Sequence, residues 1–441
     1  MDNNQNNRDH FVSKWGFILA CIGSAVGMGN IWLFPYRTGA MGGAAFLIPY
    51  FLFVIIIGYT GVVEEMTFGR AMRTGPLGAF EKASKQRGSD AGKFVGWIPV
   101  IGSLGIAIGY TVVVGWILRF TVGSFTGAAV KSADSGAYFG MIAGKFGSLP
   151  WHILAIIVVF LVMISGISKG IERVNKFMMP AFFVLFIILA IRVFTLPGSE
   201  AGYEFLFKPK WEMLRDPHTW VYALGQAFFS LSLAGSGTVV YGSYLEDKED
   251  ILSSAKYVAF FDTVAAMLAA IVIIPAVFAY GVEPSAGPPL MFITMPEVFK
   301  AMPGGQIFSI IFFTAVSFAG VTSLINLYET PVEGLQNKFG ISRKLSLAIV
   351  LGLGLLVGIF IEDGNVLGNW MDVVSIYIIP LGALLAAIMF LWVCKKEFVM
   401  SEMSKGRLKP VSEGFYNYSK YVFVSITIIV YILSIFFGGI G

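Results

Sequence analysis

The stretch Gly23-Ser-Ala-Val-Gly-Met-Gly-Asn30 interrupts the first apolar segment of the chain, and Pro35 follows soon after it. Glycine destabilises a helix, so this segment is expected to break. Inside a membrane, a break leaves backbone N–H and C=O groups unpaired at a cost of several kcal/mol each. Such breaks are tolerated where they line a cavity for ions or charged substrates. The alternative is a tight crossing of two helices, which also uses small residues.

The composition is that of an integral membrane protein. Of the 441 residues, 56% are hydrophobic and 13% are charged, whereas globular proteins carry about 25% charged residues. Apolar runs of at least about 17 residues, the length that spans a bilayer, occur eleven times. The expected spans are 15–37, 44–68, 94–125, 151–167, 177–196, 220–244, 257–280, 307–327, 345–361, 373–394 and 421–440.

Lysine and arginine indicate the orientation of these spans. If the spans alternate, 22 of the 31 basic residues lie on the side that holds the N-terminus, and cytoplasmic loops carry such an excess. We therefore expect a protein of the cell membrane, surrounded by lipid, with a cytoplasmic N-terminus and an extracellular C-terminus. The net charge of +4 reflects this loop bias and does not indicate nucleic-acid binding.

A second break is expected at Leu233-Ala-Gly-Ser-Gly237, five spans after the first. One interrupted helix in each half of a chain is typical of the binding site of a secondary transporter. The pattern predicts an all-α protein with one transporter domain, 1–441, in which helices 1 and 6 are unwound at mid-membrane. Its two inverted five-helix halves are 15–196 and 220–394, and 421–440 is an eleventh helix. Within the loop 281–306, the stretch Phe292–Phe299 is apolar enough to pack as a re-entrant plug or a lid.

Polar groups at both breaks suit a small zwitterion and cations. The first break exposes N–H groups around Met28 and Gly29 that favour a carboxylate. Oxygens for a cation or ammonium group are expected from the carbonyls of Gly23, Ala25 and Val26, the amide of Asn30, and the hydroxyls of Ser230, Ser232, Ser236, Thr322 and Ser323, the last two near the Ala319 carbonyl. The alternative for the hydroxyls is bonding within their own helix or between helices.

Four carboxylates lie in or beside the spans. Asp262 lies inside the seventh span, where a charge marks a functional site by default. Glu64 and Glu65 end the second span and either extend to the interface or tether a broken helix. Asp372 begins the tenth span. The sequence does not distinguish whether it lies in a solvated vestibule or forms part of a gate.

Five stretches occur in the same order in one known family. They are Gly23–Trp32 with Phe34-Pro35-Tyr36, Gly42–Tyr50, Gly225–Leu233, Met295–Phe299 and Phe318–Ser323. With them the chain resembles the neurotransmitter:sodium symporter family. The bacterial eleven-helix branch, with the multi-hydrophobic amino acid transporters of bacilli, is most similar.

This resemblance implies two sodium sites and no organic cofactor. The first would use Ala25, Asn30, Ser230, Asp262 and the carboxylate of the substrate. The second would use carbonyls of Gly23, Val26 and Ala319 with the hydroxyls of Thr322 and Ser323.

The resemblance also implies how an L-amino acid would bind. Its carboxylate would meet the Met28 and Gly29 amides and the Tyr110 hydroxyl, and its ammonium would meet Ala25, Phe229, Ser230 and Ser232. The side-chain pocket would be lined by Ile106, Phe229, Gly235, Ser323 and Leu327. Many relatives carry phenylalanine where this chain has Gly235, so we expect room for aromatic ligands.

The gates depart from the family pattern. Leu33 replaces the usual arginine, so an outer salt bridge to Asp372 cannot form. On the inner side, Asn337 replaces the aspartate that usually pairs with the arginine equivalent to Arg8.

The fifth span carries a further family motif. Gly170 and Pro180, separated by nine residues, resemble a motif that would let the cytoplasmic end of this span unwind. The alternative is a bent junction between a loop and a helix.

These observations predict a sodium-coupled symporter that imports hydrophobic and aromatic L-amino acids by alternating access, with no chemical reaction. Chloride independence is expected because Asp262 stands where chloride-dependent relatives have asparagine. Two alternatives stay open. A channel-like permease would need a continuous polar pore, and an amino-acid sensor would bind its ligand without accumulating it.

Overall fold

Helices form all of the regular structure in the residues that the computed structural model describes, 9–233, 236–281 and 289–439. The main helices are α1 (Lys14–Ala25), α2 (Phe34–Ala40), α3 (Ala44–Phe53), α4 (Tyr59–Met72), α7 (Trp97–Thr126), α10 (Leu149–Met163), α11 (Arg173–Phe194), α13 (Pro217–Ser230), α14 (Gly237–Gly242), α15 (Ile251–Ala279), α17 (Gly305–Phe339), α18 (Arg343–Phe360), α19 (Gly364–Val373), α20 (Ile379–Ile388) and α23 (Val424–Phe436).

Shorter elements connect or extend these helices. The short helices are α5 (Pro76–Lys85), α6 (Gly92–Val95), α8 (Ala128–Lys131), α9 (Ser135–Ile142), α12 (Ser199–Phe207), α16 (Met295–Ala301), α21 (Lys396–Ser404) and α22 (Glu413–Asn417). A 3₁₀ turn is η5 (Trp211–Arg215), and π-helical turns are η2 (Gly29–Leu33), η3 (Val54–Gly58), η4 (Ile167–Glu172), η6 (Leu290–Thr294), η7 (Val374–Ile378), η8 (Met389–Val393) and η9 (Tyr418–Phe423).

Side-chain caps fix where several helices begin. The side chains of Ser13, Asp216, Asp250 and Ser342 accept a hydrogen bond from a backbone N–H in the first turn of α1, α13, α15 and α18 respectively. A cap of this kind satisfies an N–H group that has no partner within the helix. Pro35 lies near the start of α2, which directly continues η2, so its missing N–H interrupts the hydrogen-bond ladder at this join.

The all-α fold is confirmed, but the number of eleven spans stays a prediction. Eight stretches in the described residues are long and apolar enough to cross a membrane, and the pair Lys14–Ala25 and Gly29–Ala40, bent by 54°, would make a ninth. The fourth expected span corresponds to the shorter α10. The sixth is divided between α13 and α14.

Several helices are longer than the sequence pattern predicts, among them the fifth and the eighth. The fifth begins at Ile167, in η4, because the apolar Ile167 and Ile171 are buried in the protein. The eighth runs on to Phe339, and its added turns carry Glu329, which forms a two-bond ion pair with Arg343 at 2.8 and 2.7 Å. Buried pairing therefore extends a helix past the apolar run that marks it in the sequence.

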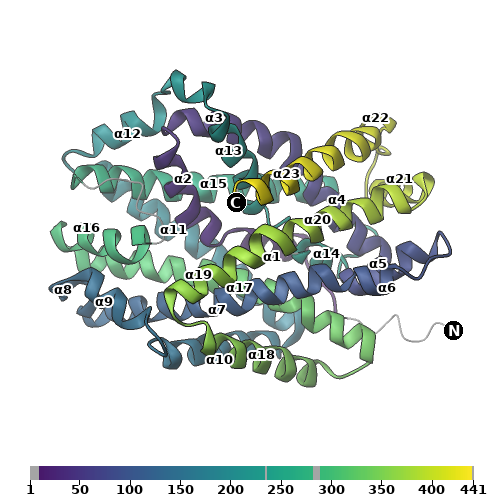
Figure 1. Ribbon diagram of the computed structural model, residues 1–441, viewed down its shortest axis with the longest axis horizontal. Coiled ribbons are helices and arrows are strands. Elements are labelled where there is room, and N and C mark those ends of the chain that lie inside the picture. The colour runs from purple at the N-terminus through teal and green to yellow at the C-terminus, as the bar shows by residue number, and fades with distance from the viewer. Residues whose placement is uncertain (1–8, 234–235, 282–288, 440–441) are drawn as a thin grey trace.

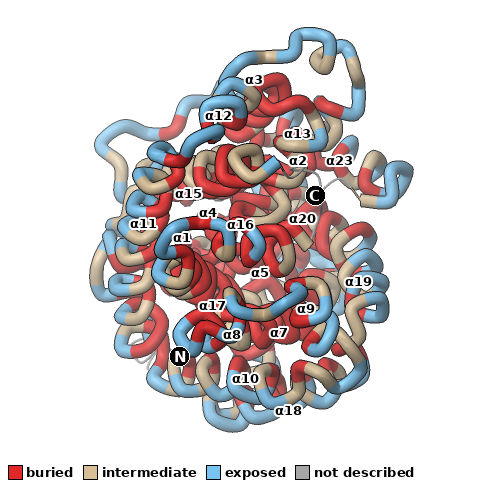
Figure 2. The backbone as a smooth tube through the Cα atoms, turned by 90° about the vertical axis from the view of Figure 1, so that its left-hand side faces the viewer, coloured by how far each residue is buried: buried red, intermediate tan, exposed pale blue. Residues whose placement is uncertain are grey.

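The helices pack so that the first break lies deep inside the protein. α7 and α17 lie alongside each other, with α10 and α18 against them on one side (Figure 1). α1 packs against α11, α15 and α17. Buried residues gather in the interior, and the outer rim is exposed (Figure 2). Exposed side chains such as Ile55, Phe177 and Phe194 give this rim the apolar surface that lipid requires.

Gly69 provides a test of the packing between α4 and α14. A Cβ atom at Gly69 would lie 1.8 Å from the Val239 carbonyl oxygen, whereas one at Gly352 in α18 would meet nothing within 4 Å. We expect Gly69→Ala to lower the melting temperature in detergent by several degrees. Gly352→Ala should leave it unchanged or raise it, since alanine favours a helix by about 1 kcal/mol over glycine. Equal melting temperatures for the two variants would contradict this packing.

Candidate functional site

At the first break, the backbone N–H groups do not form the hydrogen bonds of an α-helix. The Gly27 N–H donates to Asn30 Oδ1 at 3.2 Å instead of to the Gly23 carbonyl. The Asn30 N–H donates to the Gly27 carbonyl at 3.1 Å instead of to the Val26 carbonyl. The Gly23 and Val26 carbonyls therefore lose their helical donors, as expected from the glycine pattern.

The Ser24 carbonyl joins the two breaks. It accepts hydrogen bonds from the Ser232 hydroxyl at 3.0 Å and from the Ser323 hydroxyl of α17 at 3.2 Å. Ser232 has a φ of 55° and Ser236 a φ of 50°, a left-handed conformation that costs a non-glycine residue about 1–3 kcal/mol. At Ser232 the bond to Ser24 helps to offset this strain.

Asp262 connects three elements in the interior. Its carboxylate is fully buried and accepts from Ser230 Oγ at 2.7 Å and from Asn30 Nδ2 at 2.7 Å. Asn30 thus presents its amide nitrogen here, whereas a sodium ligand would present the oxygen. The physical reason is that a buried carboxylate needs donors. The amide oxygen of Asn30, Oδ1, faces the first break, where it accepts from the Gly27 N–H and keeps a second lone pair.

A second set of oxygens lies where α1 meets α17. A Cβ atom at Gly23 would lie 3.0 Å from Thr322 Cβ, so the two backbones approach closely. Thr322 Oγ1 donates to the carbonyls of Phe318 at 2.9 Å and Ala319 at 3.1 Å. This brings Gly23, Ala319 and Thr322 together, whereas the Ser323 hydroxyl is bonded to Ser24. Hard cations prefer several oxygen ligands of this kind.

A cavity of about 580 Å³ opens from the first break, within the size range of small-molecule sites. Nine of the residues expected to bind substrate line it: Ala25, Met28, Gly29, Ile106, Tyr110, Phe229, Ser232, Ser323 and Leu327. Ser230 is not among the residues that line the cavity and bonds to Asp262. Gly235 and Arg8 lie outside the described residues.

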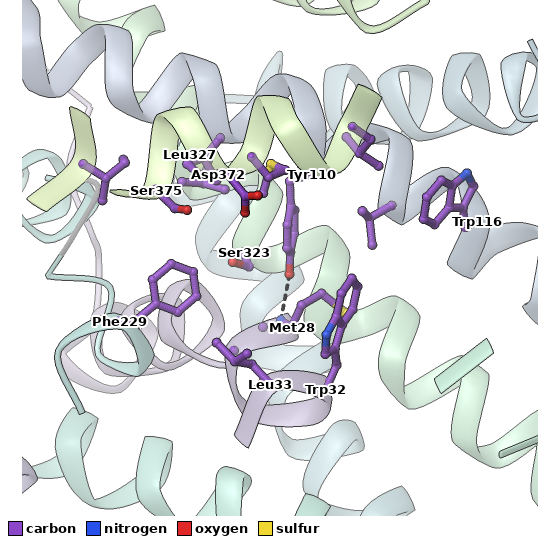
Figure 3. Close-up of a pocket in the computed structure, with 18 of the residues that line it drawn as sticks. Met28, Trp32, Leu33, Tyr110, Trp116, Phe229, Ser323, Leu327, Asp372 and Ser375 are labelled. Atoms are coloured by element: carbon purple, nitrogen blue, oxygen red, sulfur yellow. Dashed lines mark hydrogen bonds between the residues drawn. The ribbon is translucent and has the colours of Figure 1, made fainter. Parts of the chain in front are cut away.

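One end of the cavity is polar and its walls are apolar. The Met28 N–H donates to the Tyr110 hydroxyl at 3.0 Å (Figure 3). A Cβ atom at Gly27 would lie 2.8 Å from this hydroxyl and 3.0 Å from the Ser323 hydroxyl, so only glycine fits between them. Phe229 and Leu327 face the same space (Figure 3). The arrangement suits a ligand with one charged end and one apolar end.

Aromatic residues close the far side of the cavity. The expected lid stretch is helical from Leu290 to Ala301, and its Phe292 ring stacks on Phe139 at 5.0 Å. Phe292 also contacts Trp116 at 5.9 Å and Trp32 at 6.4 Å. Trp32, Trp116 and Phe139 line the cavity and were not expected from the sequence, because aromatic residues in a span are usually core.

Three polar contacts at the breaks were not expected from the sequence. Gln226 Nε2 donates to the Gly29 carbonyl at 3.0 Å, and Asn326 Nδ2 donates to the Gly237 carbonyl at 3.3 Å. Asn326 lies about one turn after Ser323, and a polar residue in a membrane span is a usable signal. The Ser24 carbonyl carries no side-chain signal and could not be found in this way.

The gate residues make no charged pair in the described part of the chain. Leu33 and Asp372 both line the cavity (Figure 3). On the opposite side, Asn337 Nδ2 donates to Thr74 Oγ1 at 2.8 Å, and Thr74 Oγ1 donates to Glu333 at 3.1 Å. This contact is a chain of hydrogen bonds with a neutral amide at its start.

Three further candidate residues lie around this core. The Glu65 carboxylate accepts a hydrogen bond from Thr238, directly after the second break. Gly170 lies in η4, where a Cβ atom would be 2.1 Å from the Val162 carbonyl oxygen. Pro180 lies inside α11. The stretch from Gly170 to Pro180 is therefore helical in this structure.

Comparison with known proteins gives concordant matches. The model of the sodium:neurotransmitter symporter family matches residues 8–133 and 140–438. An uncharacterized sodium-dependent transporter of Bacillus subtilis, YhdH, is 36% identical, over 90% of each chain. An uncharacterized sodium-dependent transporter of Methanocaldococcus jannaschii is 32% identical over 87% of this chain and 82% of its own. The crystal structure of MhsT in complex with L-phenylalanine matches with a TM-score of 0.87 and 35% identity, over 97% of this chain and 100% of MhsT.

The hydrogen bonds around Asp262 predict a measurable coupling. Ser230→Ala should lower the free energy of unfolding by about 1.5–3 kcal/mol, the usual contribution of a hydrogen bond to a charged group. In an Asp262→Asn background the same change should cost at least about 1 kcal/mol less, because the charge is gone. Unfolding by sodium dodecyl sulfate in mixed micelles measures both. Additive effects would show that the two side chains do not interact.

Proposed function

This chain belongs to the sodium:neurotransmitter symporter family, and we propose that it imports hydrophobic and aromatic L-amino acids by alternating access. The family consists of secondary transporters and its relatives here are named sodium-dependent. The chain is therefore a multi-pass, sodium-dependent membrane transporter and not an enzyme. We propose the identity of its substrate and the number of its ion sites.

The observation that carries the substrate class is the polarity of the cavity. At its polar end the Tyr110 hydroxyl accepts from the Met28 N–H at 3.0 Å, and this hydroxyl can donate its own proton to a carboxylate. Its walls are formed by side chains such as Ile106, Phe229 and Leu327. An apolar amino acid matches this arrangement, and L-phenylalanine is the ligand in the MhsT complex.

We assign the sodium ions to the two oxygen sets described above. The first would use Ala25, Asn30, Ser230 and Asp262 with the carboxylate of the substrate, which couples sodium to substrate binding. The second would use Gly23, Val26, Ala319, Thr322 and Ser323. Support comes from the freed carbonyls of the first break and from the buried charge of Asp262.

In the proposed cycle, the halves 15–196 and 220–394 rock around the ligand. Leu33 and Asp372 would lie on the extracellular side, with Glu65 and the Asn337–Thr74 contact on the cytoplasmic side. The N-terminus would be cytoplasmic and the C-terminus extracellular, and the helix from Gly170 to Pro180 would open the inner path.

Uptake into proteoliposomes tests this function. With sodium outside, the purified protein should accumulate leucine, valine, phenylalanine and tryptophan, and internal unlabelled substrate should accelerate the exchange of label. Gly235→Phe should weaken the binding of tryptophan much more than that of valine, since the added ring takes up space in the side-chain pocket. Uptake that does not saturate would indicate a channel, and binding without sodium-driven accumulation would indicate a sensor.

Asp262 predicts that transport needs no chloride. Two cations and a zwitterion in a buried site require a compensating charge, because an unpaired buried ion costs several kcal/mol. Asp262 supplies that charge, with the buried Tyr50 and Gln226 expected beside it. Replacing chloride by gluconate should therefore leave uptake unchanged, while Asp262→Asn should abolish sodium-driven uptake. Wild-type uptake that stops in gluconate would contradict the assignment.

A further inference from the structure

Asn175 is a polar residue in the interior that the site described so far does not use. It lies in the first turn of α11 and is fully buried. Its Nδ2 donates to the Ile171 carbonyl at 2.9 Å, while its Oδ1 accepts no hydrogen bond from the described residues. A buried acceptor without a partner costs about 1–3 kcal/mol, so this oxygen needs an explanation.

The orientation of the Asn175 amide follows from its neighbours. If the amide were turned over, its oxygen would face the Ile171 carbonyl oxygen, and two acceptors would meet. The nitrogen therefore bonds to Ile171, and the oxygen points away from its own helix. A helical asparagine that only bonded back to the preceding turn would satisfy its nitrogen and leave the oxygen unexplained.

Asn175 Oδ1 lies against Gly23 of α1, beside Thr322 of α17. A Cβ atom at Gly23 would lie 2.0 Å from Asn175 Oδ1 and 3.0 Å from Thr322 Cβ. Glycine at position 23 therefore leaves room for the amide oxygen to approach α1, beside α17. α1, α11 and α17 all pack against one another. The carbonyl of Gly23, the residue that this oxygen lies against, lacks its helical donor.

We propose that Asn175 Oδ1 is a further ligand of the cation at the second sodium site, contributed by α11. The inference rests on the sodium site of the proposed function and adds a ligand to it. The donor set fits sodium, because an amide oxygen, backbone carbonyls and the Thr322 hydroxyl are hard, uncharged oxygens. A cation there gives the unpaired oxygen of Asn175 a partner.

This ligand would connect sodium to the cytoplasmic end of α11. Asn175 lies three residues after Glu172, where η4 ends. The Glu172 carboxylate accepts from the Val12 N–H at 2.8 Å and from Ser13 Oγ at 2.9 Å, which ties the N-terminal segment to the same turn. Release of the cation would remove the contact that holds α11 against Gly23.

Sodium binding without amino acid isolates this site, because the first sodium site is proposed to need the substrate carboxylate. The readout is the melting temperature of the purified protein as sodium chloride replaces choline chloride at constant ionic strength, which rises as sodium binds. Asn175→Leu, which fills the space without an oxygen, should raise the sodium concentration at half-effect about tenfold. Asn175→Asp should lower it, because a charged ligand binds a cation more tightly.

Met179→Ala is the matched control, since Met179 is fully buried one turn further along α11. This variant should lower the melting temperature at every sodium concentration without changing the sodium concentration at half-effect. If the sodium concentration at half-effect in Asn175→Leu stays within about twofold of the wild-type value, the inference is overturned and the proposed function stands. If Asn175→Leu does not fold, Asn175→Asp decides, and an unchanged half-effect again overturns it. A wild-type protein that sodium does not stabilise overturns the proposed function, and this ligand with it.

Discussion

Backbone groups that lose their helical partners in a water-poor interior constrain the whole centre of this protein. At the first break the lost bonds are replaced by bonds from other helices: Tyr110 accepts from the Met28 N–H, Gln226 donates to the Gly29 carbonyl, and Ser232 and Ser323 donate to the Ser24 carbonyl. Each replacement comes from a different part of the chain. The break is therefore maintained by the packing of the bundle, and the bundle in turn must place these side chains around it.

Much of the fold could be predicted from local pattern, because glycine, proline and apolar length act within one segment. The break after Gly23 and the depth of Asp262 are of this kind. The extension of the fifth helix to Ile167 and of the eighth to Phe339 could not be predicted, since both depend on tertiary burial and pairing. Gly235 and Arg8 lie outside the described residues, so the expectations placed on them stay predictions.

The candidate site shows the same division between local and distant information. Residues with a polar side chain in an apolar span, such as Ser232 and Thr322, could be selected from the sequence. Their partners could not, because the Ser24 carbonyl is a backbone atom and the meeting of Asn175 with Gly23 depends on how α11 lies against α1. The orientation of the Asn30 amide is likewise set by the Asp262 charge beside it and not by its own segment.

The apolar lining of the cavity at Leu33, Trp32 and Phe229, taken as its outer part in the proposed cycle, has a thermal consequence. An aperture that closes by bringing apolar side chains together draws its driving force from the release of water, which is entropic near room temperature and accompanied by a heat-capacity change. That force weakens on cooling, and ionic strength hardly affects it, whereas a salt bridge is screened by salt. In the proposed cycle, closing the outer side of the cavity would thus be sensitive to cold and tolerant of salt, whereas closure by a salt bridge would be weakened by salt.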